Sequence, residues 1–435
     1  MAACYAAASG YRAEPGEICL APDETGALAG VLLGVGQGAA RDPFMAGKLA
    51  RPLPAGTYAL AGGFDDPFLA ALAFELGGYD FARFRRKPDR RKGSPRLRVP
   101  DGVAGVRVSL VADAIALGRD LINRPAGDLG PAALEAAARE VAGTHGASAA
   151  SICGDDLLAA NLPMIHAVGR AAAEPPRLVD ITWGDPDAPK VTLVGKGVCF
   201  DTGGLDIKPS SAMLLMKKDM GGAATALSLA VMIMAAKLPV RLRVLLPIVE
   251  NAISGNAFRP GDILQSRKGP TVEIGNTDAE GRLILADALA LADEEAPELL
   301  LDFATLTGAA RVALGPDLPP FYTMDDGLAA AIAQHAATTN DPAWRMPLWD
   351  PYDALLKSKV ADVSNISGGS FAGSVTAALF LRRFVEHAGA WAHFDIYGWT
   401  PSAKPARPEG GEVQTAHCLF SLLDERFPAG GGAEP

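Results

Sequence analysis

The sequence has few cysteines and no long apolar run, and each of these features argues against certain classes of protein. Its five cysteines are odd in number and scattered, without a C-x-x-C pair. That pattern argues against a disulfide framework or a zinc ribbon and favours the reducing cytoplasm. The longest apolar segment, Ala223 to Ala236, is interrupted by Thr225 and Ser228 and falls short of the roughly 20 residues that span a bilayer. We therefore expect no membrane association, and the opening residues lack the basic region and apolar stretch of a signal peptide.

Positive charge is also in deficit. The chain has 40 Lys and Arg residues against 50 Asp and Glu residues, a formal net charge of −10, and a negative molecule is repelled by the phosphates of nucleic acid. The exception is the basic segment Phe81 to Arg98, in which Pro88 and Pro95 prevent a long helix. Only Phe81 and Phe84 are present there to stack on bases. We therefore interpret the segment as a linker or a solvated arm, with nucleic-acid binding as the weaker alternative.

The length predicts two domains, because 435 residues exceed the size at which a single hydrophobic core stops growing. In residues 1–100, short apolar runs such as Ala29 to Val35 and Tyr58 to Ala61 alternate with Gly and Pro, which is typical of a small α/β domain. Residues 101–130 are interpreted as a linker with a bridging helix from Gly105 to Asn123, and residues 131–435 as the larger domain. The Gly-rich tail from Gly430 is expected to be disordered.

The larger domain alternates strand-like and helix-like patterns. Strands are expected at Leu178 to Trp183, Val191 to Phe200, Val240 to Val249 and Leu299 to Phe303, and helices near Gly222 to Ala236 and Leu283 to Ala292. This alternation predicts an α/β/α sandwich, in which helices cover both faces of a sheet. Loops that bind ligands lie at the carboxyl ends of the strands in such sheets.

Several familiar motifs are incomplete. Gly34 to Ala39 has the outline of a dinucleotide-binding turn, but Pro43 interrupts the helix that should follow. Lys196 in Gly-Lys-Gly lacks the rest of a phosphate-binding Walker motif. Ser370 lacks the second glycine of a nucleophile elbow, and Cys199 lies inside an apolar run. The six histidines form no H-E-x-x-H pair. A nucleotide, a protein nucleophile and a histidine-bound zinc are therefore all disfavoured.

Ionisable residues gather instead in three segments where loops should leave the strand ends. Carboxylates gathered in this way repel one another unless cations lie among them. The alternative is that these carboxylates only cap a helix or pair with Lys208 and Lys217. The three segments are Val194 to Pro209, with Lys196, Asp201 and Lys208; Met216 to Ala224, with Asp219; and Asn276 to Leu283, with Asp278, Glu280 and Arg282.

Taken together and in this order, the three segments resemble the signature of the leucyl aminopeptidase family of dinuclear metallopeptidases. The string N-T-D-A-E-G-R-L at Asn276 to Leu283 is the most specific part. The resemblance extends from about Gly105 to Leu422 and includes Arg124-Pro-Ala, Ser254 to Asp262 and Thr305 to Ala309. It implies that residues 131–435 are a catalytic metallopeptidase domain, preceded by the small α/β domain that is usual for the family.

The resemblance also implies a set of roles for individual residues. One metal ion would be held by Asp201, Asp278 and Glu280, and the other by Lys196, Asp201, Asp219 and Glu280. Oxygen ligands without histidine suit zinc or manganese and also magnesium. A lysine ligand must be neutral, which two adjacent dications can bring about. The ions would turn a bridging water into the attacking hydroxide.

Further roles follow from the same resemblance. Lys208 would stabilise the oxyanion, and Arg282 would hold a bicarbonate that acts as general base. Met216, Thr305, Leu306 and Gly308 match substrate-binding positions, and an apolar pocket would favour N-terminal leucine-like residues of peptides. The sequence departs from the family at Tyr397 and Trp399, where small residues are usual. A homo-hexamer in the cytoplasm is implied as well.

Two alternatives to this aminopeptidase remain. A dipeptidase or another amidase on the same dinuclear scaffold would keep every metal ligand and differ only in its substrate pocket. A non-enzymatic protein, either an oligomeric scaffold or a nucleic-acid binder that uses Phe81 to Arg98, would not need the metal ligands at all. The complete set of ligands ranks this second alternative last.

Overall fold

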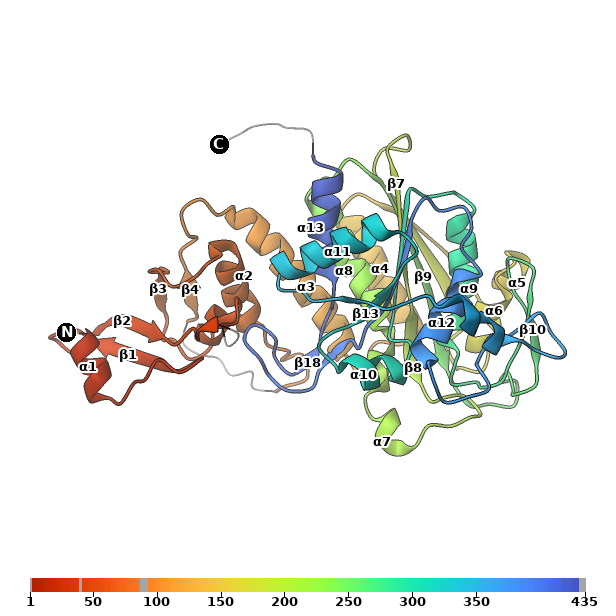
Figure 1. Cartoon of the computed structure of the whole chain (residues 1–435), viewed down its shortest axis with the longest axis horizontal. Coiled ribbons are helices and arrows are strands. Elements are labelled where there is room, and N and C mark those ends of the chain that lie inside the picture. The colour runs from red at the N-terminus through yellow and green to blue at the C-terminus, as the bar shows by residue number, and fades with distance from the viewer. Residues whose placement is uncertain (1, 39–40, 87–92, 430–435) are drawn as a thin grey trace. The chain divides into compact units, whose positions relative to one another are not determined.

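The computed structural model describes residues 2–38, 41–86 and 93–429, and the chain forms two compact units (Figure 1). The smaller unit comprises residues 1–116 and 401–409, and the larger unit comprises residues 117–400 and 410–435. The domain boundaries expected at residues 100 and 130 stay predictions. The middle of the basic segment, Lys87 to Lys92, and the tail from Gly430 lie outside the described residues.

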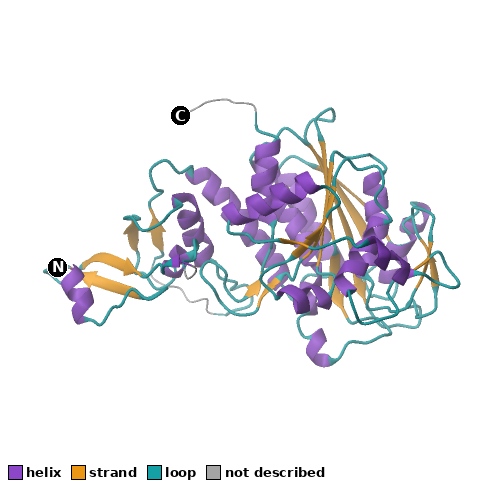
Figure 2. Cartoon of the chain, viewed as in Figure 1, coloured by secondary structure: helices purple, strands orange, loops and turns teal. Residues whose placement is uncertain are grey.

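The smaller unit combines short strands with helices (Figure 2), and Leu49, Leu53 and Phe74 belong to its small apolar core. Strands β1 and β2 pair in antiparallel fashion, and β3 and β4 pair in parallel. Leu97 of β4 packs against the core, so the interpretation of the basic segment as a linker or arm is wrong for residues 95–97, which form a strand. The elements are α1 (Ala2–Ala8), β1 (Ile18–Pro22), β2 (Leu28–Leu33), η2 (Met45–Leu49), β3 (Gly56–Tyr58), α2 (Pro67–Gly78), β4 (Pro95–Leu97) and the start of α3 (Gly105–Asn123).

The larger unit contains a nine-stranded mixed sheet. Its central strands β16, β12, β7 and β9 run parallel to one another, as does β8 alongside β9, whereas β6 and β5 continue the sheet in antiparallel fashion. Every residue of β12 is buried, as expected of a strand covered on both faces. The strand order is β14 (Trp344–Arg345), β13 (Pro320–Tyr322), β16 (Trp391–Asp395), β12 (Leu299–Ala304), β7 (Lys190–Gly195), β9 (Arg241–Asn251), β6 (Arg177–Trp183) and β5 (Ser148–Cys153), with β8 (Gly197–Asp201) beside β9.

Helices cover both faces of this sheet, which confirms the predicted sandwich (Figure 1). One layer contains α4 (Pro131–Thr144), α8 (Gly221–Ala235), α11 (Asp326–Thr338) and α13 (Ala416–Arg426), and the other contains α6 (Pro163–Gly169), α9 (Gly281–Asp293) and α12 (Gly373–Arg382). Among the described helices, none is both long and apolar enough to cross a membrane. The remaining elements are α5 (Asp156–Ala159), α7 (Ser210–Met213), η3 (Met216–Met220), β10 (Ile263–Gln265), β11 (Thr271–Glu273), α10 (Gly308–Leu314), η4 (Asp350–Leu356), β15 (Val363–Ser364), β17 (Trp399–Thr400) and β18 (Gly410–Gly411).

The predicted strand Val191 to Phe200 differs from the structure, because it is divided at Lys196 into β7 and β8. The backbone N–H of Lys196 still donates to the carbonyl of Phe303 in β12 (3.0 Å), and the carbonyl of Lys196 accepts from Ala223 in α8 (2.8 Å). Strand β7 pairs with both β12 and β9, whereas the described pairing of β8, from Gly197 onward, is with β9 alone. The apolar run gave no sign of this break, which brings the Lys196 side chain to the edge of the sheet.

Asp287 of α9 is fully buried, and hydrogen bonds to its carboxylate join α9 to two other segments of the chain. It accepts hydrogen bonds from the backbone N–H groups of Met164 (2.8 Å), Ile165 (3.4 Å) and Arg267 (2.9 Å). An Asp287→Ala substitution leaves these donors buried without partners, so we expect the free energy of unfolding to fall by about 2 to 4 kcal/mol, as measured by urea denaturation. Asp326→Ala is the control, since Asp326 forms an exposed ion pair with Arg345 and should cost less than about 1 kcal/mol. Equal losses in the two variants would contradict this account.

Candidate metal centre

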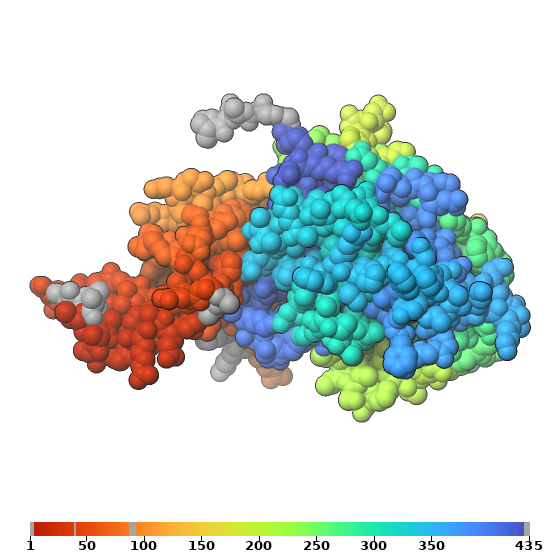
Figure 3. Space-filling model, in the orientation of Figure 1, coloured from red at the N-terminus to blue at the C-terminus, as the bar shows by residue number. Residues whose placement is uncertain are grey.

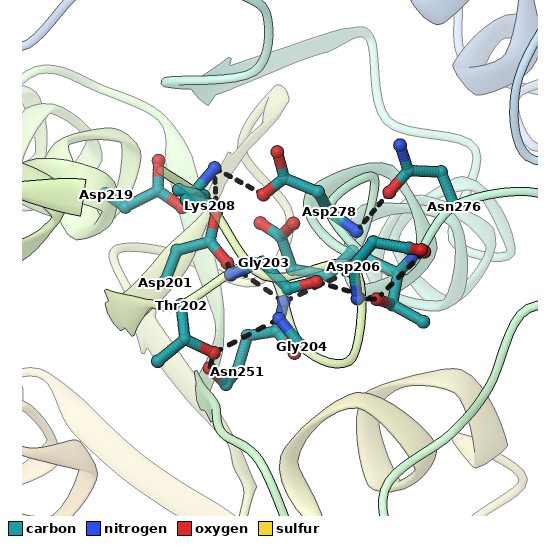
Figure 4. A network of polar contacts seen from close by, with 12 residues as sticks. Asp201, Thr202, Gly203, Gly204, Asp206, Lys208, Asp219, Asn251, Asn276 and Asp278 are labelled. Carbon is teal, nitrogen blue, oxygen red and sulfur yellow. Dashed lines mark hydrogen bonds and ion pairs between the residues drawn. The ribbon is translucent and has the colours of Figure 1, made fainter. Parts of the chain in front are cut away.

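Five of the predicted site residues come together at one end of the sheet, and Figure 4 shows three of them, Asp201, Asp219 and Asp278. Lys196 follows β7, and Asp201 is the last residue of β8. Asp219 lies in η3 immediately before α8, and Asp278 and Glu280 immediately precede α9. Because the central strands are parallel, their carboxyl ends meet at the same edge. The segment that leads from Asp201 to Asp219 by way of α7 emerges at the surface of the larger unit, in yellow-green in Figure 3.

Lys196 forms ion pairs with two of these carboxylates. Its Nζ lies 2.7 Å from Asp219 Oδ2 and 2.9 Å from Glu280 Oε1, and it donates to the carbonyl of Thr305 at 3.1 Å. Burial alone would lower the pKa of Lys196, but the charges of the three nearest carboxylates raise it above its ordinary value. In this structure Lys196 therefore lies where it compensates the buried negative charge of Asp219 and Glu280.

Lys208 lies between the other pair of carboxylates. Its Nζ is 2.8 Å from Asp201 Oδ2 and also forms an ion pair with Asp278 Oδ1. The ion pair between Lys208 and Asp201 is one of the two that we would expect if the carboxylates had only a structural role. The other is absent from the described contacts, because Lys217 donates to the backbone carbonyl of Asn123 at 2.8 Å and Asp219 pairs with Lys196.

The carboxylates fit a binding site for divalent cations. One oxygen each from Asp201, Asp278 and Glu280 lies within 4.8 Å of the others. Oε2 of Glu280 is buried without a hydrogen-bond partner among the described residues, which is unfavourable unless a cation is bound. Burial, followed by the charge of Asp201, raises the pKa of Glu280 to about 8 and that of Asp278 to about 6. Divalent cations among these oxygen ligands would relieve that repulsion.

A second set of residues holds the carboxylates in place, and sequence reasoning missed it. Asn251, at the end of β9, donates from Nδ2 to Asp201 Oδ1 (2.9 Å) and to the carbonyl of Thr277 (3.1 Å). Thr277 Oγ1 donates to the carbonyl of Gly203 (2.6 Å), and Gly203 adopts a φ of +87° that disfavours other residues. These contacts join the loop after β8 to the loop before α9 (Figure 4). The only signal in the sequence was the position of Asn251 at a strand end.

Arg282 lies in the first turn of α9 and is buried, with 8% of its surface exposed. Its Nη1 donates to the carbonyl of Asn365 at 2.6 Å, while its Nε has no hydrogen-bond partner among the described residues. Burial lowers the pKa of Arg282 to about 10, so the guanidinium stays charged at neutral pH. A buried cation with an unused donor that lines the same cavity as the carboxylates can bind a small anion there.

The predicted substrate-binding residues surround one cavity of about 290 Å³. Met216, Thr305, Leu306 and Gly308 all line it, together with the five predicted metal ligands, Lys208 and Arg282. Thr305 Oγ1 donates to Asp219 Oδ1 at 2.7 Å and so ties the wall of the cavity to the carboxylate cluster. Tyr397 and Trp399 are not among the described residues that line the cavity. The centre of the Tyr397 ring lies 4.8 Å from Nζ of Lys218, and the centre of the Trp399 ring lies 5.5 Å from Nζ of Lys217.

Asp395 at the end of β16 fixes the loop after β12, and sequence reasoning also missed this residue. Its Oδ1 accepts hydrogen bonds from the backbone N–H groups of Leu306 (3.0 Å) and Thr307 (3.1 Å). Its Oδ2 accepts from the hydroxyls of Thr307 (2.6 Å) and Ser374 (3.0 Å). The carboxylate is therefore fully used in holding one wall of the cavity. Adjacent parallel strands, β12 and β16, bring the two segments together.

Gly281 allows the close approach of Lys196 to α9. A Cβ atom at this position would lie 2.7 Å from Lys196 Nζ, so Gly281→Ala should displace the lysine while the helix still forms. We expect the rate of peptide hydrolysis to fall by about tenfold to a hundredfold, because small displacements in a site are costly. Gly143→Ala in α4 is the matched control, since its Cβ would meet nothing within 4 Å. Equal activity in the two variants would contradict the assigned contact.

Comparisons with known proteins agree with this geometry. The sequence profile "Cytosol aminopeptidase family, catalytic domain" matches residues 116–419, and "M17 aminopeptidase, N-terminal domain" matches residues 1–100. The chain is similar to the probable cytosol aminopeptidases of Syntrophotalea carbinolica (41% identity, 75% of this chain and 66% of the relative) and Nitratidesulfovibrio vulgaris (42%, 81% and 73%).

Solved structures show the same likeness. The crystal structure of the cytosol aminopeptidase from Coxiella burnetii has a TM-score of 0.92 at 49% identity and covers 98% of this chain and 93% of that one. The bottromycin maturation enzyme BotP in complex with Mn has a TM-score of 0.90 at 34% identity, with 97% and 96% covered. The profile of the catalytic domain covers most of the larger unit. The profile of the N-terminal domain matches residues 1–100, which precede the part of the chain where the sequence resemblance was found. The chain belongs to the cytosol aminopeptidase family.

Proposed function

We propose that this protein is a metal-dependent aminopeptidase that hydrolyses the first peptide bond of peptides with a free N-terminus. The observation that carries the proposal is the cluster of Asp201, Asp278 and Glu280, in the same cavity as two cationic side chains, with a buried carboxylate oxygen that has no hydrogen-bond partner in the described part of the chain. Such a cavity would bind cations through its carboxylates and stabilise developing negative charge through its lysine and arginine side chains. Membership of the aminopeptidase family makes peptides the expected substrates.

Two divalent ions would be held by the chain's own side chains. Asp201, Asp278 and Glu280 would bind one ion, and Lys196, Asp201, Asp219 and Glu280 the other. When bound, such ions acidify a water molecule and polarise the scissile carbonyl. Manganese is a good candidate because BotP was solved with Mn, and zinc and magnesium share a preference for oxygen ligands.

The protein's cations would complete the reaction. Lys208, whose ammonium points into the cavity between Asp201 and Asp278, would move its hydrogen bonds to the carbonyl oxygen of the substrate as negative charge develops. Arg282 would hold a bicarbonate through its Nε, which has no hydrogen-bond partner among the described residues, and a bicarbonate held there would supply a general base. Asp219 would orient the free α-amine of the substrate, which explains why only N-terminal residues would be released.

The side chains that line the cavity suggest the size of the substrate's N-terminal residue. Met216, Leu306 and Gly308 form a wall without charge, which suits a leucine-like or similarly long side chain. We also propose a cytoplasmic homo-hexamer, with neither membrane nor nucleic acid as a partner. Size-exclusion chromatography with light scattering measures the number of subunits directly, and a monomer would contradict that part of the proposal.

The activity is tested with leucine p-nitroanilide and its N-acetylated form, using chelated enzyme that is reloaded with manganese or zinc. We expect cleavage only of the free-amine substrate, only with metal, and not by an Asp278→Ala variant. Cleavage of the acetylated substrate would indicate a different amidase on the same scaffold. If the reloaded enzyme cleaves neither compound nor a panel of dipeptides, the proposed function is wrong.

A further inference from the structure

Lys218 is a buried lysine whose Nζ contacts an aromatic ring but has no hydrogen-bond or ion-pair partner among the described residues. Only 2% of its surface is exposed, and it lines the cavity of the metal centre. Its Nζ lies 4.8 Å from the centre of the Tyr397 ring, and no hydrogen bond or ion pair of Nζ occurs among the described residues. A buried ammonium normally has a carboxylate or several acceptors beside it, because an uncompensated buried charge is unfavourable.

The nearest carboxylates are already in use. Asp219 is bound to Lys196 and to the hydroxyl of Thr305. Asp395 accepts hydrogen bonds on both oxygens, from the loop after β12 and from Ser374. Neither carboxylate forms a hydrogen bond or an ion pair with Lys218 among the described contacts, so both act on its charge only from a distance.

A second cation increases the positive charge at this end of the cavity. The guanidinium of Arg311 in α10 lies 4.7 Å from the centre of the same Tyr397 ring, and its Nη1 donates to the carbonyl of Thr307 at 3.0 Å. Arg311 also lines the cavity. The two basic side chains thus lie beside the same Tyr397 ring, and both line the cavity that should receive the substrate.

We propose that Lys218, assisted by Arg311, binds a carboxylate of the substrate, and that this carboxylate is the side chain of an N-terminal glutamate or aspartate. The inference rests on the proposed aminopeptidase activity. Lys218 directly precedes Asp219, which would orient the α-amine of the first residue, so the group that reaches Lys218 belongs to that same residue. The wall formed by Met216 and Leu306 would contact the methylene groups of a glutamate as it does those of a leucine. The alternative source is the C-terminal carboxylate of a dipeptide.

The test compares three substrates, Glu-Leu-amide, Leu-Leu-amide and Leu-Leu, in the wild-type protein and in Lys218→Met. In the wild type we expect kcat/KM for Glu-Leu-amide to be at least equal to that for Leu-Leu-amide. In Lys218→Met the ratio of these two values should fall by about tenfold or more, because a charged hydrogen bond is lost only with the acidic substrate. The ratio of Leu-Leu to Leu-Leu-amide should not change. Since each ratio is taken within one variant, a general loss of activity does not affect it.

Lys217→Met is the matched control, because Lys217 is the neighbouring lysine but donates to the carbonyl of Asn123 and is not among the described lining residues. Its glutamate-to-leucine ratio should equal that of the wild type. An unchanged ratio in Lys218→Met overturns the inference, and so does a fall in the Leu-Leu ratio, which would assign the carboxylate to the C-terminus. If the wild type cleaves none of the three substrates, the proposed activity itself fails, and the binding measurement below then decides the role of Lys218.

Binding without turnover gives an independent readout. Isothermal titration of the manganese-loaded protein with L-glutamate, the product, should show affinity that falls by about tenfold in Lys218→Met, while the affinity for L-leucine is unchanged. Equal affinities for L-glutamate in the wild type and the variant would overturn the inference.

Discussion

Glu280→Gln is expected to lower kcat/KM for Leu-Leu-amide by about a thousandfold or more. Glu280 is buried, its Oε2 has no hydrogen-bond partner among the described residues, and it is the one carboxylate that would contact both cations without also contacting Lys208. Replacing an oxygen anion by a neutral amide removes negative charge where cations must bind, and each tenfold in rate corresponds to about 1.4 kcal/mol of transition-state stabilisation. Steady-state kinetics at saturating manganese measure the loss, and isothermal titration with manganese should show affinity weakened by about a hundredfold.

The control for this substitution lies at the other end of the same helix. Glu294 is the C-cap residue of α9, is exposed and pairs with Arg267 at 2.7 Å. Glu294→Gln changes the same chemical group on the same element, so it should leave both the kinetics and manganese binding as in the wild type. A Glu280→Gln variant that retains normal manganese affinity would show that Glu280 has a structural role only.

The sequence predicts the main features of the fold because its apolar patterns are long. A helix is observed at Gly105–Asn123, with the expected bounds, and the four expected strands of the larger unit all occur, one of them divided. The division at Lys196 was not predictable, since it depends on where the neighbouring strands β9 and β12 offer hydrogen bonds. Short strands such as β4 were missed, because a segment of three residues is too short to show the alternation of apolar and polar residues that distinguishes a strand from a loop.

The candidate site shows the same contrast between local and distant information. The loops that carry Lys196, Asp278 and Glu280 lie within sequence motifs that can be recognised without the structure, and the fold brings their side chains together. Asn251 and Asp395 belong to strands far along the chain, and their contacts with these loops arise from strand order alone. Lys218 was missed for a different reason. In the sequence it is one of two adjacent lysines, and only the structure shows that one of them is buried in the cavity while the other reaches a backbone carbonyl.

Lys208→Met is expected to change activity and metal affinity in opposite directions. In this structure the Lys208 ammonium lies between Asp201 and Asp278, where it compensates the charge that a cation would otherwise compensate. Without it, manganese no longer competes with the ammonium and is no longer repelled by it, so the dissociation constant should fall by about tenfold. The same substitution removes the donor proposed to stabilise the developing oxyanion, so kcat should fall by about a hundredfold to a thousandfold.

This combination of results separates a catalytic role from a structural one. If Lys208 only held the two carboxylates together, its loss would weaken manganese binding and lower kcat because of poor loading, and excess manganese would restore activity. If it stabilises negative charge on the substrate, excess manganese restores nothing, because the metal is already bound more tightly than in the wild type. Lys208→Arg is the informative companion, because it keeps the charge but displaces the donor. We expect it to bind manganese about as weakly as the wild type and still to lose most of kcat, since the position of the donor decides how well an oxyanion is stabilised.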